Sequence, residues 1–312
     1  MTTIQPNPAL ESGAALDLTP QLVSKRKSQL RLIGERFLRN KVSVIGMTVL
    51  VIIALGVIFA PLIVPGNAKY DPSTTPNLLI RFQGPSLHHV LGTDDIGRDE
   101  LARLLYGGRV SMEVGFAVAI ISVIIGVVVG AVAGFFGGWV DTIMMRLTDA
   151  LLSVPLLLIL IVLSKSFGNG QISDVVIIIS AFEWLILARI VRGEFLALKE
   201  REFLLAARTL GAGNLRLMFR HILPNAIGPI VVGGTLAVGD AIIIESTLSF
   251  FSFGINPPTP SWGNMLTDAQ GYLSVDTLLA ILPGLAILFT VLCVNLMGDG
   301  LRDALDPYMT QR

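Results

Sequence analysis

Charged side chains are scarce in this sequence of 312 residues. Asp, Glu, Lys and Arg together make up 15% of the chain, whereas hydrophobic residues make up 53%. A protein of this size whose whole surface faced water would need more charge. The composition therefore predicts a membrane protein. The formal net charge is zero, so the charge balance does not indicate a nucleic-acid partner.

Several chemical groups are missing as well. The single cysteine, Cys293, excludes a disulfide within the chain and a thiolate metal site made by this chain alone. The adjacent His88 and His89 do not make a zinc site, which needs three or four convergent ligands. The sequence also lacks a Gly-x-x-x-x-Gly-Lys-Ser/Thr phosphate loop and the groups of a membrane protease. We therefore predict a non-catalytic subunit that binds no cofactor or metal of its own.

Long apolar runs are plentiful. A transmembrane helix needs about 20 mostly apolar residues, because lipid offers no partner to unpaired backbone groups. Six runs meet this need: 42–64, 114–140, 142–164, 175–190, 226–248 and 278–297. The second run is rich in glycine, which predicts close packing against neighbouring helices, and the third contains Pro155, which a neighbouring helix would have to accommodate. The sequence thus predicts an all-α membrane protein with six transmembrane helices.

The placement of positive charge predicts the orientation. Of the 23 Lys and Arg residues, 17 fall in segments on the side of the N-terminus, and cytoplasmic loops retain positive charge. Both termini are therefore predicted to be cytoplasmic. Besides the first span (42–64), the chain is predicted to divide into five segments. These are a disordered cytoplasmic tail (1–24), an amphipathic cytoplasmic helix (25–41), an extracytoplasmic loop with a short helix (65–109), a five-helix core (110–298) and a cytoplasmic C-terminal tail (299–312).

Two of the segments outside the membrane are predicted to be structured. The helix at 25–41 is cationic with one apolar face, which suits contact with anionic membrane lipid; a simple topology signal explains it equally well. In the outer loop, acidic residues precede an apolar stripe that begins at Leu101, a pattern typical of a helix start. We expect a short outer helix there, leading into the second span.

The cytoplasmic stretch 194–225 carries most of the functional prediction. Strong helix formers run from Glu194 to Leu210, and Gly211 ends this helix. Asn214 can cap a second helix, whose Leu215, Met218, Phe219 and Ile222 fall on one side until Pro224. Two helices joined by a glycine turn predict an element that docks another protein, although a hairpin resting on lipid headgroups remains open.

This stretch resembles a known loop. Ala206-Ala207, Gly211 and Leu223-Pro224 are similar to the Glu-Ala-Ala, Gly, Leu-Pro loop of the permease subunits of bacterial ABC importers. Leu205 stands where glutamate is usual and His221 where an aliphatic residue is usual. Both departures resemble the dipeptide, oligopeptide and nickel branch of that family. Further stretches resemble its second (C-type) permease: 91–94, 97–99, 107–111, 134–138, 189–193, 248–254, 257–263 and 295–307.

The resemblance implies a type I ABC importer permease fold, in which the loop forms coupling helices that sit in a cleft of the ATPase. It also implies the partners: a homologous permease, two ATPase subunits that bind ATP and Mg, an extracytoplasmic substrate-binding protein, and a di- or oligopeptide substrate. The identity of the substrate stays open among a dipeptide, a longer peptide, a nickel chelate and another small solute. The resemblance also implies a place in the bacterial inner membrane. The residues of this chain that match the coupling loop are Arg201, Glu202, Ala206, Ala207, Gly211, Arg220, His221, Leu223 and Pro224.

Three carboxylates fall within the predicted spans: Glu183, Asp240 and Glu245. Charge is expensive in a membrane and usually faces a cavity or a partner, so each is expected to line a wet translocation path or to make a hydrogen bond inside the helix bundle. A relay of protons or ions would instead indicate an ion-coupled secondary transporter or channel, but two inverted halves with broken helices are not evident. A scaffold that docks a partner without transport is the third alternative.

Overall fold

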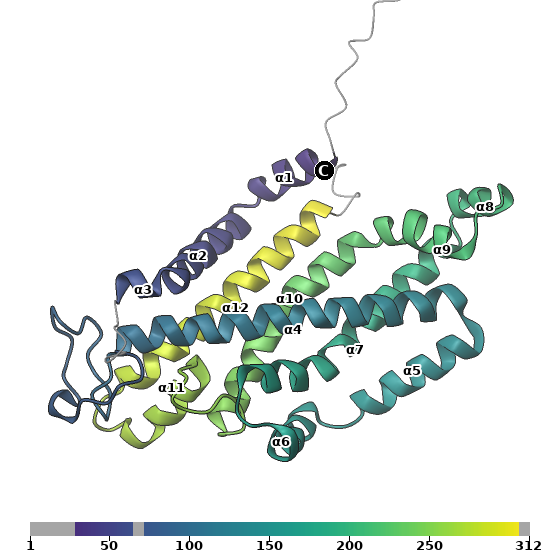
Figure 1. Cartoon of the computed structure of the whole chain (residues 1–312). Helices are drawn as coiled ribbons and strands as arrows, with labels where there is room; N and C mark the ends of the chain where they lie inside the picture. Colours follow the sequence, from purple (N-terminus) through teal and green to yellow (C-terminus); the bar gives the residue numbers. More distant parts are fainter. Residues whose placement is uncertain (1–28, 65–71, 306–312) are drawn as a thin grey trace, which may run out of the picture.

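The computed structural model describes residues 29–64 and 72–305, and within these ranges it is helical, with no β-strand (Figure 1). Predictions for residues 1–28, 65–71 and 306–312 lie outside the described residues. The α-helices are α1 Gln29–Arg39, α2 Lys41–Ile58, α3 Ala60–Ile63, α4 Glu100–Phe136, α5 Gly138–Leu152, α6 Leu156–Phe167, α7 Ile172–Lys199, α8 Glu202–Thr209, α9 Asn214–Arg216, α10 Ile227–Phe250, α11 Trp262–Ala269 and α12 Leu278–Leu305.

The long helices lie side by side between two ends (Figure 1). At one end are α8 and α9, with α1 and the last turns of α12 nearby: Asn40 donates a hydrogen bond to Asp303 (3.2 Å), and Leu305 is adjacent to Gly228 at the start of α10. We call this the elbow end, after the bent segment 200–225 that contains α8 and α9. At the other end are the loop 72–99 and α11, and we call it the loop end.

Four predicted spans coincide with helices long and apolar enough to cross a membrane, namely α2, α4, α10 and α12, and the bent pair α5–α6 would make a fifth. The 28-residue α7 is also long enough, but Asp174, Glu183 and Arg189 make it less apolar than the other four. Of the six predicted spans, the structure therefore supports four, or five if the bent pair α5–α6 is counted as one span. That α7 crosses the membrane stays a prediction.

The predicted short outer helix does not exist as a separate element. Asp99 caps α4 by accepting a hydrogen bond from the backbone N–H of Ala102 (2.8 Å), and the helix then continues unbroken for 37 residues. Gly107 and Gly108 lie inside this helix. Their lack of a side chain leaves room for Ser261 and for the Trp262 ring, which pack against the helix at these positions. A helix of this length is about 55 Å long, so α4 extends beyond a hydrocarbon core of about 30 Å.

The third predicted span is not one helix either. It divides into α5 and α6, which are bent by 84° at residues 153–155. Pro155 explains the break, because proline lacks an N–H and its ring clashes with the carbonyl group one turn earlier. The expectation that a neighbouring helix would accommodate Pro155 inside a continuous span was wrong.

The most extensive contact between two of the described helices is between α4 and α7. Gly126, Gly130 and Gly134 recur at every fourth position of α4 and face α7. A Cβ atom added to Gly130 would lie 2.5 Å from the carbonyl oxygen of Ala188, and one added to Gly134 would lie 2.7 Å from Phe195 Cβ. Small residues at this spacing let two backbones approach closely, which confirms the prediction of close packing drawn from the glycines of this run.

Gly130→Ala should therefore destabilise the protein. The added methyl group has to push two backbones apart, and overpacking of this kind costs about 1–3 kcal/mol. The measurement is the midpoint of thermal unfolding in detergent. Gly193→Ala, at a position on α7 where a Cβ would meet no atom within 4 Å, is the matched control and should not lower the midpoint. Equal midpoints for the two variants would contradict this description of the α4–α7 contact.

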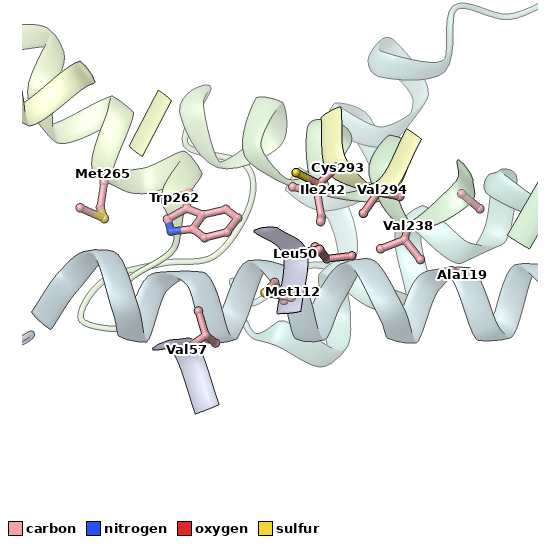
Figure 2. Close-up of a cluster of buried hydrophobic side chains, with 11 residues drawn as sticks. Leu50, Val57, Met112, Ala119, Val238, Ile242, Trp262, Met265, Cys293 and Val294 are labelled. Atoms are coloured by element: carbon pink, nitrogen blue, oxygen red, sulfur yellow. The ribbon is translucent and has the colours of Figure 1, made fainter. Parts of the chain in front are cut away.

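A cluster of buried hydrophobic side chains joins α2, α4, α10, α11 and α12 (Figure 2). Trp262, at the start of α11, is 1% exposed, and its indole N–H donates to the carbonyl oxygen of Leu104 (2.9 Å). Its ring lies near Met265, Met112 and Val57 in this cluster. The free Cys293 is buried in the same cluster. This packing fixes α11 against the first turns of α4 at the loop end.

Candidate functional site

The predicted docking stretch begins differently from expectation. The single helix predicted from Glu194 to Leu210 is divided, because α7 ends at Lys199 and α8 begins at Glu202. Arg201 has an extended backbone between them. The apolar periodicity continues across the break, since Phe195 and Leu204 are buried in one and the same cluster. We refer to residues 200–225 as the elbow.

The glycine turn of the elbow is as predicted, whereas the second half of the elbow differs in part from the predicted helix. Gly211 has a φ of +84°, a backbone conformation that strains other residues, and α8 ends just before it. Gly213, rather than Asn214, precedes the first turn of α9. The chain then widens through a π-helical segment, Leu217–Ile222, and tightens in a 3-10 turn, Leu223–Asn225.

The elbow is anchored to the transmembrane helices by its inner face. Leu204, Leu217 and Ile222 are at most 2% exposed and pack in one cluster with Phe135 of α4 and Phe195 of α7. Nearby, the Lys199 ammonium donates to the carbonyl oxygen of Phe135 (2.7 Å), a favourable place for a cation at a helix C-terminus. The elbow is therefore bound to the ends of both α4 and α7.

The outer face of the elbow exposes large apolar side chains. Leu210 is 88% exposed, Leu215 70% and Phe219 63%, and Phe203 and Leu205 are also exposed. The prediction that Leu215 and Phe219 share a face with Met218 and Ile222 was wrong, since only the latter two are buried. Grouped exposed apolar residues mark a surface that contacts another protein or lipid.

Arginines accompany these apolar side chains. Of the residues matched to the coupling loop, Arg201, Glu202, Ala206, Gly211, Arg220 and Pro224 are exposed, whereas Ala207, His221 and Leu223 are half-buried. The resemblance did not single out Arg208 and Arg216, which are exposed as well. From residue 203 to the end of the elbow the sequence has no acidic residue. The outer face is thus apolar and cationic, and it complements an apolar cleft with acidic groups.

Glu245 is enclosed within the bundle and does not line a path in this structure. Its side chain is 0% exposed, and its carboxylate accepts hydrogen bonds from the hydroxyls of Ser111 (2.9 Å), Ser249 (2.8 Å) and Ser246 (3.4 Å). The Ser111 oxygen in turn accepts from the backbone N–H of Trp262 (3.2 Å). Of the two roles expected for this carboxylate, the structure places it in the second, a hydrogen-bonded node inside the bundle.

Glu245→Leu should therefore destabilise the protein much more than Glu245→Gln. Leucine leaves the three hydroxyls without their acceptor, and each unsatisfied buried group costs about 1–3 kcal/mol. Glutamine keeps an acceptor oxygen in nearly the same volume. The midpoints of thermal unfolding of the two purified variants give the comparison. A leucine variant as stable as the glutamine variant would show that the hydroxyl groups do not depend on this carboxylate.

Glu183 and Asp240 are more accessible. Glu183, on α7, lines a cavity of about 280 Å³ beside the bend between α5 and α6, together with Ser153, Pro155 and Phe182. Asp240, on α10, is exposed in the isolated chain. A role for these two carboxylates in a translocation path stays a prediction.

A buried ionic cluster occupies the loop end. The Asp94 carboxylate, 2% exposed, accepts hydrogen bonds from the guanidinium groups of Arg98 and Arg103, and both arginines also bind Asp268 of α11 (3.0 and 2.7 Å). Asp95 instead lies beside Tyr272, where its negative charge and a hydrogen bond raise the pKa of the Tyr272 phenol. The cluster ties the loop 72–99 and α4 to α11.

Sequence reasoning missed this cluster, whose pairs with Asp268 join residues at least 165 positions apart. His89, which is close to the cluster in the sequence, contacts Asp99 through its ring nitrogen (2.8 Å). Among the described residues no group of three His, Cys, Asp or Glu side chains is arranged to hold a metal ion.

Comparison with known proteins agrees with this arrangement. Residues 126–311 match the family described as the binding-protein-dependent transport system inner membrane component. The chain belongs to this family. Residues 28–85, which include α1, α2 and α3, match the N-terminal transmembrane domain of oligopeptide transport permease C. The family consists of inner-membrane components of binding-protein-dependent transport systems, so the chain is a multi-pass permease component of the inner membrane.

Relatives similar over most of their length support the same assignment. The oligopeptide transport system permease protein OppC of Bacillus subtilis is 43% identical over 272 residues, 87% of each chain. The dipeptide transport system permease protein DppC of Haemophilus influenzae is 39% identical over 284 residues, which cover 88% of this chain and 93% of the relative. DppC of Alkalihalophilus pseudofirmus is 38% identical over 87% of each chain. These similarities confirm the resemblance to the peptide branch of the importer permeases.

Proposed function

We propose that this permease is one of two membrane subunits of an ATP-driven importer and that it translocates di- or oligopeptides. The observation that carries the proposal is the elbow: its inner face is packed on the ends of α4 and α7, while its outer face is apolar, cationic and exposed. An isolated lipid-facing hairpin would not need a rigid connection to two transmembrane helices. A cleft of a partner ATPase fits this outer face, and ATP and Mg would be bound there and not by this chain.

The orientation supports the proposal. The elbow, α1 and the last turns of α12 lie at one end of the bundle (Figure 1). Arg31, Arg36 and Arg39 of α1 add to the arginines of the elbow at this end. Because positive charge is retained in the cytoplasm, we place the elbow end there, with both termini. The loop end then faces outward, toward a substrate-binding protein.

The proposed cycle is a population shift. Closure of the ATPase subunits on ATP moves the elbow, and the elbow moves α4 and α7, so that the path between the two permeases changes from inward to outward access. Such a shift requires the ATPase to bind one of the two states more tightly. The choice of a peptide as the substrate rests on the relatives, which are oligopeptide and dipeptide transport permeases.

The substrate is tested by measuring uptake in cells that express this chain together with the proposed second permease, ATPase subunits and substrate-binding protein. Labelled di- and tripeptides should accumulate, unlabelled peptides should compete, and deletion of this chain alone should abolish accumulation. A labelled nickel chelate serves as the comparison substrate. Uptake of the chelate without uptake of any peptide would contradict the proposed substrate while keeping the importer.

A further inference from the structure

The helix α5 is attached loosely to the rest of the bundle. Only Thr148 of its 15 residues is buried, and in Figure 1 α5 lies apart from α10 and α12. Trp139, Ile143 and Leu147 are all more than half exposed. With so little buried surface, α5 is held in place by few contacts, and its position is the least constrained by packing among the long helices.

Both ends of α5 are hinges. At the first end, Gly137 and Gly138 have φ values of +66° and +56°, two consecutive left-handed residues that only glycine adopts without strain. At the second end the chain turns by 84° before α6, at Pro155. A helix with a glycine hinge at one end and a proline break at the other can rotate as a unit.

Two ion pairs connect α5 to α7. The Arg192 guanidinium makes a bidentate contact with the Asp141 carboxylate, one bond being 2.6 Å long, and Arg189 binds Asp149. Residues 141 and 149 lie near the two ends of α5, so the pairs hold the helix at two points. Bidentate arginine–carboxylate contacts add geometric specificity to the attraction.

The arginines are close to the elbow along α7. Arg192 is within the last turns of this helix, and Phe195, one turn further on, packs in the cluster that anchors Leu204, Leu217 and Ile222. A displacement of the elbow therefore displaces the stretch of α7 that carries both arginines. The cavity lined by Glu183 and Pro155 adjoins the far end of α5, where rotation of α5 would change its shape.

We propose that the pairs Asp141–Arg192 and Asp149–Arg189 are positioning contacts that transmit movement of the elbow to α5. The helix acts as a lever between the glycine hinge and the proline break, and its far end opens or closes the cavity at residues 151–156. This inference rests on the proposed function, because it requires an ATPase that moves the elbow. Partial exposure of both pairs (side chains 16–50% exposed) means that they add little stability, so variants should fold.

The experiment compares transport with ATP hydrolysis in the complete transporter, reconstituted in liposomes with its companion permease, ATPase subunits and substrate-binding protein. For Asp141→Asn and Arg192→Gln, ATP hydrolysis stimulated by the binding protein and peptide should continue, while peptide transported per ATP falls about tenfold, a loss typical of a broken coupling. The charge exchange, Asp141→Arg with Arg192→Asp, should restore most of the transport per ATP. Glu35→Gln, which breaks the exposed Arg31–Glu35 pair of α1, is the matched control and should change neither quantity.

Several results would overturn the inference. Hydrolysis and transport that fall by the same factor would show that the pairs serve assembly alone, and unchanged transport per ATP would show that α5 needs no connection to α7. Failure of the charge exchange to restore transport would exclude the pairing as the cause. If the wild-type assembly shows no stimulated hydrolysis, the proposed function itself fails, a result seen before any variant is compared.

Discussion

Phe219→Asp is expected to disconnect the permease from its ATPase without unfolding it. Phe219 is 63% exposed on the outer face of the elbow, and substitutions at exposed positions usually change stability by less than about 0.5 kcal/mol. At an interface, in contrast, a large aromatic side chain in the centre of a contact often contributes about 2 kcal/mol or more to binding. An aspartate in the contact adds the cost of burying an unpaired carboxylate.

The measurement for Phe219→Asp is the amount of ATPase that copurifies with the tagged permease, together with the thermal midpoint of the permease itself. Copurification should fall to background and the midpoint should stay. Leu79→Asp is the matched control, because Leu79 is another highly exposed apolar residue (92%) at the opposite, loop end. Loss of ATPase in both variants, or in neither, would mean that the elbow is not the docking surface.

Asp94→Asn is expected to destabilise the loop end strongly. The Asp94 carboxylate is 2% exposed and is the common partner of Arg98 and Arg103, which are themselves buried. It also accepts hydrogen bonds from the backbone N–H groups of Arg98 (2.7 Å) and Ile96 (3.1 Å). Asparagine removes the negative charge that the two buried guanidinium groups share. Asp268 stays within hydrogen-bond distance of both, whereas Glu100 is 3.5 Å from Arg103 and Asp95 is 3.8 Å from Arg98. Removing one partner from a buried ionic cluster costs about 3–5 kcal/mol.

The neighbouring Asp95 provides the control for this prediction. Its carboxylate is 3.8 Å from Arg98 and its side chain is 20% exposed, so Asp95→Asn should cost no more than about 1 kcal/mol. Hydrogen exchange of α11 in the two variants, with their thermal midpoints, gives the comparison. We expect fast exchange of α11 only for Asp94→Asn. Similar exchange in both variants would show that the loop end is held by packing around Trp262 instead.

The sequence was sufficient where local chemistry decides the structure. Four predicted spans coincide with α2, α4, α10 and α12, because uninterrupted apolar runs have few alternatives in lipid. The glycine content of the run 114–140 correctly predicted close packing, and Gly211 correctly predicted the turn of the elbow. These features depend on residues that are close together in the sequence.

The sequence was insufficient where two distant segments decide the structure. The pairs Arg192–Asp141 and Arg103–Asp268 join residues 51 and 165 positions apart, and no periodicity encodes such a choice of partner. The amphipathic pattern also misplaced Leu215 and Phe219, because apolar side chains can follow the same spacing whether they are buried or exposed. Pro155 was visible in the sequence, but a continuous span was predicted there instead of the 84° bend between α5 and α6.

One measurement tests most directly whether the elbow connects ATP hydrolysis to transport. ATP hydrolysis by the purified assembly in lipid nanodiscs is followed with and without the substrate-binding protein and peptide, for wild type and for Gly211→Asp. Gly211 has a φ of +84°, so aspartate strains the turn. We predict that binding protein and peptide together stimulate hydrolysis in the wild type and that Gly211→Asp abolishes the stimulation. Equal stimulation in both proteins would contradict the coupling role of the elbow.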